Sequence, residues 1–237
     1  MKSITTAALL CVLGAAPCMA QEWFPNLYTS VQGLYGSPRG EFSTHVDRGW
    51  GLDLNLHAPV TAELPLALRM DVGFVTYGRH VQNVCFDTKV ECGRELDLTT
   101  TNSIQYIDAG VQLMLPWGPV RPYASLVGGV SYFTTNTTAE AMRLGQSFGS
   151  NQTDHSDLTV GWKSGGGVLI RLLGGHAPLF LDLSAHYHAN GMAEYVTEED
   201  VSATSDGNIV ISPRRGETNL WAFQIGLALG ILPEYGR

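Results

Sequence analysis

Large apolar residues alternate with small or polar residues over several separate segments of the chain. In residues 50–57, which read WGLDLNLH, every second residue is large and apolar, and the residues between them are glycine or polar. Successive side chains of a β-strand point to opposite faces of the sheet, so a period of two predicts a strand with one apolar and one polar face. Residues 217–231 show the same two faces, and they predict a last strand near the end of the chain.

The alternation predicts eight strands in all. They lie within residues 27–35, 50–57, 66–74, 107–115, 122–133, 158–171, 179–188 and 217–231. Polarity does not distinguish the two faces of the fifth segment, so its orientation stays open. Three consecutive glycines, residues 165–167, interrupt the sixth segment and predict a bend or a bulge there.

Connections of two lengths join the predicted strands. Three are short turns, and four are longer polar stretches expected to be loops: 58–65, 116–119 and 172–178 are short, and 36–49, 78–102, 134–157 and 190–216 are long. Within the last loop, Asp206-Gly207 predicts a hairpin turn between Val201 and Ile211. An even number of strands with short turns at one end and long loops at the other is typical of a barrel that crosses an outer membrane, where the short turns face the periplasm.

Charge placement indicates which face of the barrel is outside. The apolar face of the eight segments carries no Asp, Glu, Lys or Arg, whereas the other face carries Asp53, Arg69, Asp71, Asp108, Lys163, Arg171 and Asp182. A Lys or Arg that faces lipid at the membrane centre costs roughly 2–4 kcal/mol. We therefore predict an all-β, eight-stranded, antiparallel up-and-down transmembrane barrel, with its apolar face towards lipid and its charged face towards the lumen.

Aromatic residues favour the same orientation. Seven of them fall where predicted strands adjoin the long loops: Tyr35, Trp50, Phe74, Tyr132, Trp162, Tyr187 and Trp221. Trp and Tyr are enriched where a membrane meets water. These residues therefore predict one interfacial girdle near the long-loop end of the barrel.

The first twenty residues have the pattern of a secretory signal peptide. Lys2 precedes an apolar run, Ala7–Ala16, and Ala20 stands before the polar Gln21. The run is shorter than the roughly 20 residues that a membrane-spanning helix needs. We therefore expect cleavage after Ala20 and a single barrel domain over residues 21–237.

Two properties of the mature chain bear on its surroundings. Export leads into an oxidising compartment, so Cys85 and Cys92 are expected to form a short-range disulfide. The formal net charge is −8, and loss of Lys2, the only charged residue among the first twenty, makes it −9. Such an acidic chain argues against a nucleic-acid partner.

The charged lumen face predicts a packed interior. An eight-stranded barrel is only just wide enough inside for side chains, and buried opposite charges are expected to pair. We therefore expect Arg69, Lys163 and Arg171 to find partners among the four aspartates of the same face.

One face of the seventh segment carries residue types that hydrolases use: Asp182, Ser184, His186 and His188. Barrel enzymes that deacylate lipid A have a His-x-Ser-Asn motif, whereas residues 188–191 read HANG and lack the serine. Ser184 is also predicted to point into the lumen, away from acyl esters. Two alternate histidines lack a third metal ligand. We therefore expect polar lumen residues here, with no catalytic site, metal or cofactor.

The end of the last segment resembles the signal that the outer-membrane barrel-assembly machinery reads. A polar residue is followed two positions on by glycine, and two alternate large apolar residues come after it: Gln224, Gly226, Leu229 and Ile231. With its eight segments, the mature chain resembles the small barrels of the OmpA/OmpX type, the outer membrane protein beta-barrel domain family of Gram-negative bacteria. The resemblance implies location in the outer membrane, the assembly machinery as a partner during biogenesis, and contact with outer-membrane lipid and lipopolysaccharide.

These expectations favour a non-enzymatic outer-membrane barrel that acts in surface recognition, adhesion or envelope structure through its long extracellular loops. The alternatives are a lipid-modifying enzyme of the lipid A deacylase type, a narrow porin and a soluble ligand-binding barrel. The enzyme requires a serine and a histidine within hydrogen-bond reach on the outer surface, and the porin requires a continuous lumen.

Overall fold

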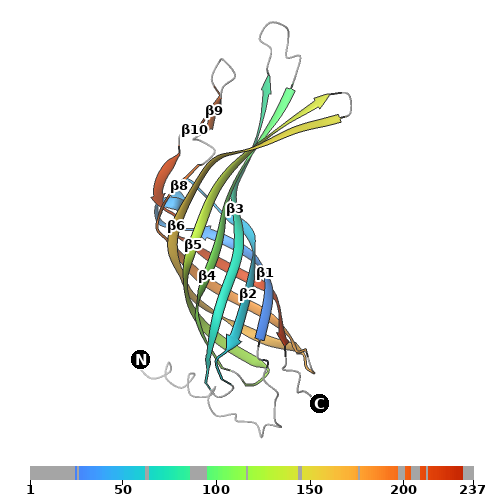
Figure 1. Ribbon diagram of the computed structural model, residues 1–237, viewed down its shortest axis with the longest axis vertical. Coiled ribbons are helices and arrows are strands. Elements are labelled where there is room, and N and C mark those ends of the chain that lie inside the picture. Colours follow the sequence, from blue (N-terminus) through green and yellow to red (C-terminus); the bar gives the residue numbers. More distant parts are fainter. Residues whose placement is uncertain are drawn as a thin grey trace, which may run out of the picture.

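Eight strands of the computed structural model form one closed barrel (Figure 1). The structure describes residues 25, 27–61, 64–85, 95–115, 117–143, 146–175, 177–196, 201–203, 209–211 and 213–231. The barrel strands are β1 (Leu27–Pro38), β2 (Gly49–Pro59), β3 (Leu66–Cys85), β4 (Glu95–Met114), β5 (Val120–Arg143), β6 (Gln146–Leu173), β7 (Leu179–Asn190) and β12 (Leu220–Ile231). They close in the order β1-β12-β7-β6-β5-β4-β3-β2, and every neighbouring pair is antiparallel. The predicted closed, eight-stranded, all-β fold is confirmed, and it is the architecture of the barrels that the sequence resembles.

The predicted last strand closes the barrel. β12 pairs with β1 from Leu27↔Ile231 to Pro38↔Leu220, and it pairs with β7 on its other side. Pairing on both sides satisfies the backbone groups that an unpaired edge strand would present.

Three short connections lie at one end of the barrel, which we term the short-connection end. Residues 60–65 join β2 to β3, residues 115–119 join β4 to β5, and residues 174–178 join β6 to β7. Gly118 and Gly175 have φ values of 89° and 100°. Glycine adopts such values without the strain that a side chain causes, so these residues allow the chain to reverse tightly.

The opposite end differs from the loops expected there. The β3–β4 pairing continues to Cys85↔Glu95, and the β5–β6 pairing continues to Arg143↔Gln146, so most of the second and third expected loops is strand. The two hairpins rise beyond the barrel wall in Figure 1. The sequence did not predict these strand extensions, because neither segment sustains an alternation of large apolar and polar residues. A strand beyond the barrel wall has no apolar surroundings to impose the alternation by which a strand is detected.

Shorter elements lie at the same end of the barrel: η1 (Gly40–Thr44), β8 (Met192–Tyr195), β9 (Val201–Ala203), β10 (Ile209–Ile211) and β11 (Arg214–Glu217). β8 pairs with β11, and β9 pairs with β10, which confirms the hairpin predicted between Val201 and Ile211. Among the described residues, no helix is long and apolar enough to span a membrane.

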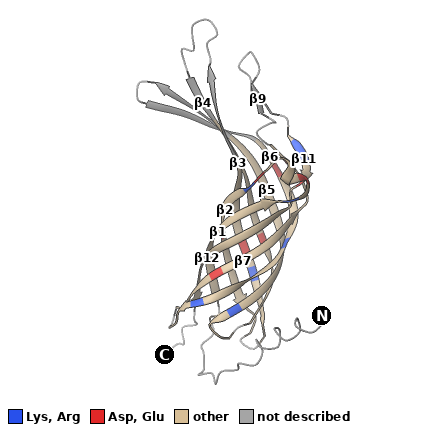
Figure 2. Cartoon of the chain, turned by 180° about the vertical axis from the view of Figure 1, so that it is seen from behind, with Lys and Arg blue, Asp and Glu red and all other residues tan. Residues whose placement is uncertain are grey.

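The side chains of the barrel wall divide as the alternation predicts. In the described part of the barrel strands, no side chain exposed on the outside is charged, and the exposed large residues other than Gln105 are apolar or aromatic. Charged positions are correspondingly few along the barrel wall in Figure 2. The structure gives the orientation of the fifth strand, β5, which the polarity of its residues did not determine. Tyr123, Ser125 and Val127 are buried inside, whereas Ala124 and Leu126 are exposed outside.

The glycines of the sixth strand provide space instead of a bulge. Gly165, Gly166 and Gly167 pair in unbroken register with both β5 and β7. The register shifts of β6 lie elsewhere, between Thr153 and His155 in its pairing with β5 and between Arg171 and Leu173 in its pairing with β7. A Cβ at Gly167 would overlap the hydroxyl of Tyr123. The sequence predicted a bend or a bulge at these glycines; the unbroken pairing contradicts the bulge, and the hydroxyl of Tyr123 takes up the space beside Gly167.

Aromatic side chains form a row of ring contacts on the outside of five adjacent strands. The row runs through Trp50, Tyr35, Phe223, Trp221, Tyr187 and Trp162, from β2 across β1, β12 and β7 to β6, with successive ring centroids 4.8–6.5 Å apart. We term it the aromatic row. It confirms the predicted girdle over these strands and adds Phe223 to it.

Candidate functional site

The middle of the barrel interior holds five charged residues, which we term the lumen charge cluster: Asp53, Arg69, Asp71, Asp108 and Lys163. The Nζ of Lys163 lies 2.5 Å from Asp71 Oδ2, 3.5 Å from Asp108 Oδ2 and 3.7 Å from Asp53 Oδ2. Arg69 Nε donates a hydrogen bond of 2.7 Å to Asp71 Oδ1. Four different strands thus bring one ammonium, one guanidinium and three carboxylates together.

Neutral side chains add hydrogen bonds to this cluster. Tyr106 donates a hydrogen bond from its hydroxyl to Asp53, and Arg69 donates from Nη1 to Gln112 Oε1 at 2.6 Å. Removing ions from water costs several kcal/mol for each ion, and paired and hydrogen-bonded geometry is needed to offset that cost. The cluster therefore depends on being complete, since the loss of one partner leaves a buried charge.

Asp182 and Arg171, which the sequence places on the same face, have other surroundings. The carboxylate of Asp182 accepts hydrogen bonds from Ser30 Oγ at 3.2 Å and from Tyr123 at 2.8 Å. Arg171 is half-buried at the register shift of β6. It lies eight residues beyond Lys163, which corresponds to roughly 26 Å along a strand. Arg171 therefore belongs to the short-connection end of the barrel.

Apolar side chains fill the interior above the charge cluster, at the end opposite the short connections. This cap cluster comprises Leu34, Phe42, Val46, Val75, Tyr77, Ile104, Tyr106, Phe133, Ala193, Tyr195, Leu220 and Ala222. Phe42 of η1 is completely buried, with its ring centroid 5.3 Å from that of Tyr77 and 5.1 Å from that of Tyr195. The first and last inter-strand connections thus pack into the mouth of the barrel.

A second apolar cluster lies towards the short-connection end: Tyr28, Met114, Tyr123, Leu169, Phe180 and Ala228. Arg121 is buried among these residues, donates a hydrogen bond of 2.6 Å from Nη1 to the Tyr28 hydroxyl, and lies 5.0 Å over the Phe180 ring. Sequence reasoning missed Arg121 as a lumen residue because Arg121 stands one residue before the predicted fifth segment, 122–133, whose orientation was open. Its charge was the signal that could have set that orientation.

The histidines of β7 contact side chains of other strands, both next to β7 and farther round the barrel. His186 is buried, and its two ring nitrogens lie 3.0 Å from Ser125 Oγ and 3.0 Å from Gln224 Oε1. Ser184 donates a hydrogen bond of 2.9 Å to the same Gln224 oxygen. His188 is also buried, with its ring edge-on to Tyr106 at 5.2 Å.

The serine that meets a histidine is therefore Ser125, which sequence reasoning did not consider. Both Ser125 and His186 are buried inside the barrel, away from the outer surface that a lipid substrate would reach. In the described part of the chain, no group of three or more His, Cys, Asp or Glu side chains is arranged to hold a metal ion. The arrangement around His186 can position and rigidify neighbouring strands.

The remaining predicted residues fall on the closing strand or outside the described part of the chain. Gln224 and Gly226 of β12 face the interior, whereas Leu229 and Ile231 are exposed on the outside. The expected disulfide includes Cys92, and the expected signal peptide covers residues 1–20; both lie outside the described residues.

Comparisons with known proteins bring out solved structures only. No protein family model matches the chain, and no curated protein matches it. It is similar to Neisserial surface protein A, with 11% identity over 87% of this chain and 97% of that chain and a TM-score of 0.39. It is also similar to the attachment invasion locus protein Ail of Yersinia pestis, solved in complex with the heparin analogue sucrose octasulfate (11% identity, 87% and 99% of the two chains, TM-score 0.38). A major outer membrane protein from Thermus thermophilus shows 16% identity over 85% and 98% of the two chains, with a TM-score of 0.38. Similarity at this level does not bear on the function or the partners of the chain.

Proposed function

We propose that the chain is a non-enzymatic outer-membrane barrel of a Gram-negative bacterium with a closed lumen, which acts at the cell surface in recognition, adhesion or envelope structure. The observation that carries this proposal is the outside of the barrel wall, where large apolar side chains are exposed on seven of the eight strands without a charge among the described residues. A monomeric soluble protein rarely exposes an apolar surface of this extent to water. Contact with lipid accounts for such a surface, and the aromatic row fits a membrane interface.

The filled interior supports a structural barrel over a narrow porin. The charge cluster lies between the cap cluster and the apolar cluster around Arg121, so three layers of buried side chains succeed one another along the barrel. Buried opposite charges in contact attract one another strongly, which favours a lumen filled by side chains over a lumen filled by water. This packing also argues against a soluble barrel that holds a ligand inside.

The lipid-modifying alternative requires a reactive serine beside the outer leaflet. The serine that contacts a histidine, Ser125, is 6% exposed and lies in the lumen. A lipid ester in the outer leaflet cannot reach it without opening the barrel wall. The proposal therefore assigns the residues of β7 to the packing of the interior.

The surface role is assigned to the hairpins that extend β3–β4 and β5–β6 beyond the barrel wall. A rigid scaffold that presents polar segments is the usual arrangement of a recognition surface. Outer-membrane lipid and lipopolysaccharide would surround the barrel, and the assembly machinery would act on β12 during biogenesis. The hairpins would then point away from the cell.

Membrane fractionation combined with gel mobility tests this proposal. The chain should be found in the outer-membrane fraction, and its mobility should change after boiling because a folded barrel resists the detergent at room temperature. In planar bilayers it should give no stable, large conductance. A soluble chain with unchanged mobility would overturn the membrane assignment, and a steady large conductance would overturn the closed lumen.

A further inference from the structure

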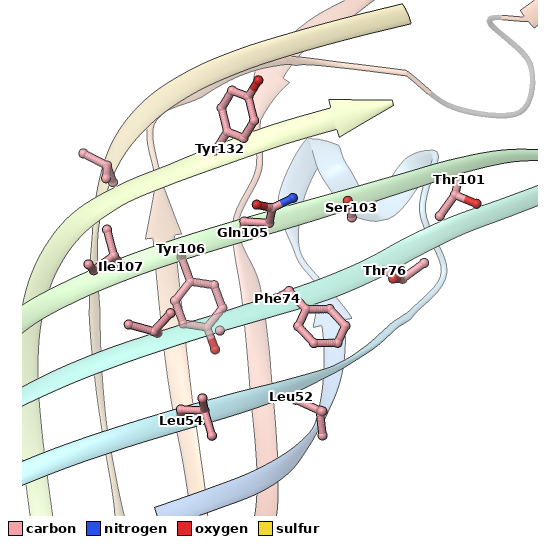
Figure 3. Close-up of a pocket in the computed structure, with 13 residues that line it drawn as sticks. Leu52, Leu54, Phe74, Thr76, Thr101, Ser103, Gln105, Tyr106, Ile107 and Tyr132 are labelled. Atoms are coloured by element: carbon pink, nitrogen blue, oxygen red, sulfur yellow. The ribbon is translucent and has the colours of Figure 1, made fainter. Parts of the chain in front are cut away.

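A groove of about 660 Å³ lies on the outer face of the barrel, across strands β2 to β5 (Figure 3). Its floor is apolar and consists of Leu52, Leu54, Val72, Ile107 and Val130. The floor continues the apolar outside of the barrel wall, to which acyl chains would be adjacent if the proposed function is correct. The groove is thus a concave part of the same surface.

The polarity of the groove changes along its length. In the pairing register, Val72, Ile107 and Val130 form one row across β3, β4 and β5, and the next row is Phe74, Gln105 and Tyr132. Beyond these rows lie three hydroxyl residues, Thr76, Thr101 and Ser103, towards the hairpins. One end of the groove therefore suits hydrocarbon, and the other end suits groups that form hydrogen bonds.

Gln105 lies at the change from one end to the other. Its side chain is exposed on the outside of the barrel, on the strand between those that carry Phe74 and Tyr132 (Figure 3). An amide placed in apolar surroundings without a hydrogen-bond partner is unfavourable by about 1–3 kcal/mol. A polar group of a bound molecule at this depth would remove that cost.

The groove also lies where the aromatic row is not continued. The row covers β6, β7, β12, β1 and β2. Next to Trp50, at the β2 end of the row, the paired residue on β3 is Thr76, and the residue paired with Thr76 on β4 is Ser103. At the level of Trp50, β3 and β4 thus carry hydroxyl residues, whereas the strands of the aromatic row carry large rings.

The place of the groove and the chemistry of its lining together indicate the lipid. The hydroxyl end of the groove lies towards the hairpins, which the proposed function directs away from the cell, so the groove opens to the outer leaflet, where the lipid is lipopolysaccharide. None of the residues that line the groove is charged, so they would contact the acyl linkage and not the phosphates of the lipid. In lipopolysaccharide the acyl chains start at a sugar, through amide and ester linkages, and several of them carry a hydroxyl group. Neutral amide and hydroxyl side chains match that linkage.

We propose that the groove binds one hydroxyacyl chain of lipopolysaccharide, with the hydrocarbon on the apolar floor and the linkage to the sugar at Gln105 and the adjacent hydroxyls. The inference rests on the proposed function, because it requires the barrel to lie in an outer membrane. The groove thereby gives the barrel a fixed position for one lipid of the outer leaflet.

Lipid retention by matched variants tests the assignment. Full-length mature protein is folded in nanodiscs that contain phosphatidylethanolamine and deep-rough lipopolysaccharide, is extracted with a mild detergent, and is weighed by native mass spectrometry. Val72→Trp fills the groove. Val111→Trp is the control, because Val72 and Val111 are 42% and 41% exposed on the outside and Val111 does not line the groove. Gln105→Leu removes only the amide.

Wild type and Val111→Trp should each retain one lipopolysaccharide per barrel, and Val72→Trp and Gln105→Leu should retain at least about fivefold less. Equal retention by Val72→Trp and Val111→Trp, retention of phosphatidylethanolamine in place of lipopolysaccharide, or no retained lipid would each overturn the inference. Gel mobility before and after boiling is measured on every sample. A chain that fails to fold in nanodiscs contradicts the proposed function, whereas a folded chain without the lipid contradicts the groove assignment alone.

Discussion

The ammonium of Lys163 on β6 lies 2.5 Å from the Asp71 carboxylate on β3, on the opposite side of that carboxylate from Arg69. β6 and β3 are separated in the barrel by β4 and β5. The contact therefore crosses the lumen and ties two parts of the wall that no backbone ladder joins directly. The charge cluster thus fills the lumen and also acts as a cross-brace, by which we mean that it links strands of the wall that are not paired with each other.

Lys163→Met should destabilise the barrel strongly. It removes the cation that contacts Asp53, Asp71 and Asp108, and breaking a buried pair by removing one partner typically costs about 3–5 kcal/mol. The measurement is the urea midpoint of unfolding in detergent micelles, with the folded fraction at each urea concentration read from gel mobility without boiling. Adding Asp108→Asn to the variant should recover part of the loss because one uncompensated carboxylate disappears. An unchanged midpoint for the single variant would contradict the cross-brace.

Phe42→Ala should loosen the first connection between barrel strands without unfolding the barrel. Phe42 is completely buried against Tyr77 and Tyr195, and a Phe-to-Ala change in a core costs about 3–5 kcal/mol. Arg39 and Arg48 are exposed on either side of η1 and are sites for trypsin. Cleavage there should accelerate by more than about tenfold, the factor that 1.4 kcal/mol produces.

The control for this change is Phe74→Ala. Phe74 is 44% exposed on the outside of the barrel, so its removal leaves the cap cluster intact. Trypsin should cleave that variant at the wild-type rate. Equal acceleration by both variants would show that the cleavage reports general instability and not release of η1.

Gly73→Ala should destabilise the barrel by overfilling it. A Cβ at Gly73 would overlap the ring of Tyr106, whose hydroxyl is held by Asp53. Overpacking of this kind typically costs about 1–3 kcal/mol. Gly33→Ala is the matched control, because a Cβ there would meet only Ile225 O at 3.7 Å, an ordinary contact. Urea midpoints should fall for Gly73→Ala and stay near wild type for Gly33→Ala; the reverse order would exclude a steric role for Gly73.

The period of two was sufficient to predict the barrel wall because lipid and lumen impose opposite demands on alternate residues. It identified the lumen positions of Asp53, Arg69, Asp71, Asp108 and Lys163 in the same way. Alternation failed where one of the two demands is absent. Val127 and Phe133 are apolar although they face inward, and Phe133 belongs to the cap cluster, which is a hydrophobic core. The two faces of β5 therefore looked alike.

The partners of the charged residues could not be predicted from the sequence. Lys163 and Asp71 are ninety-two positions apart, as 163 − 71 gives, and only the closure of the barrel brings them into contact. The outer groove is equally invisible in a linear pattern, because Gln105 is one polar residue in an otherwise regular strand. Its neighbours Phe74 and Tyr132 are set by the register of β3, β4 and β5.

Arginine on the outside of the barrel wall should be costly in proportion to its depth in the membrane. Ile225 lies in the middle of β12 and is 60% exposed, whereas Leu115 is 44% exposed at the short-connection end. An Arg at the bilayer midplane costs roughly 2–4 kcal/mol and near the interface about 0–1 kcal/mol. Ile225→Arg should therefore lower the urea midpoint of the barrel in liposomes much more than Leu115→Arg. Because both side chains are already exposed, a protein whose outer face met water would tolerate both changes equally. Equal, small effects would therefore mean that this face does not contact lipid.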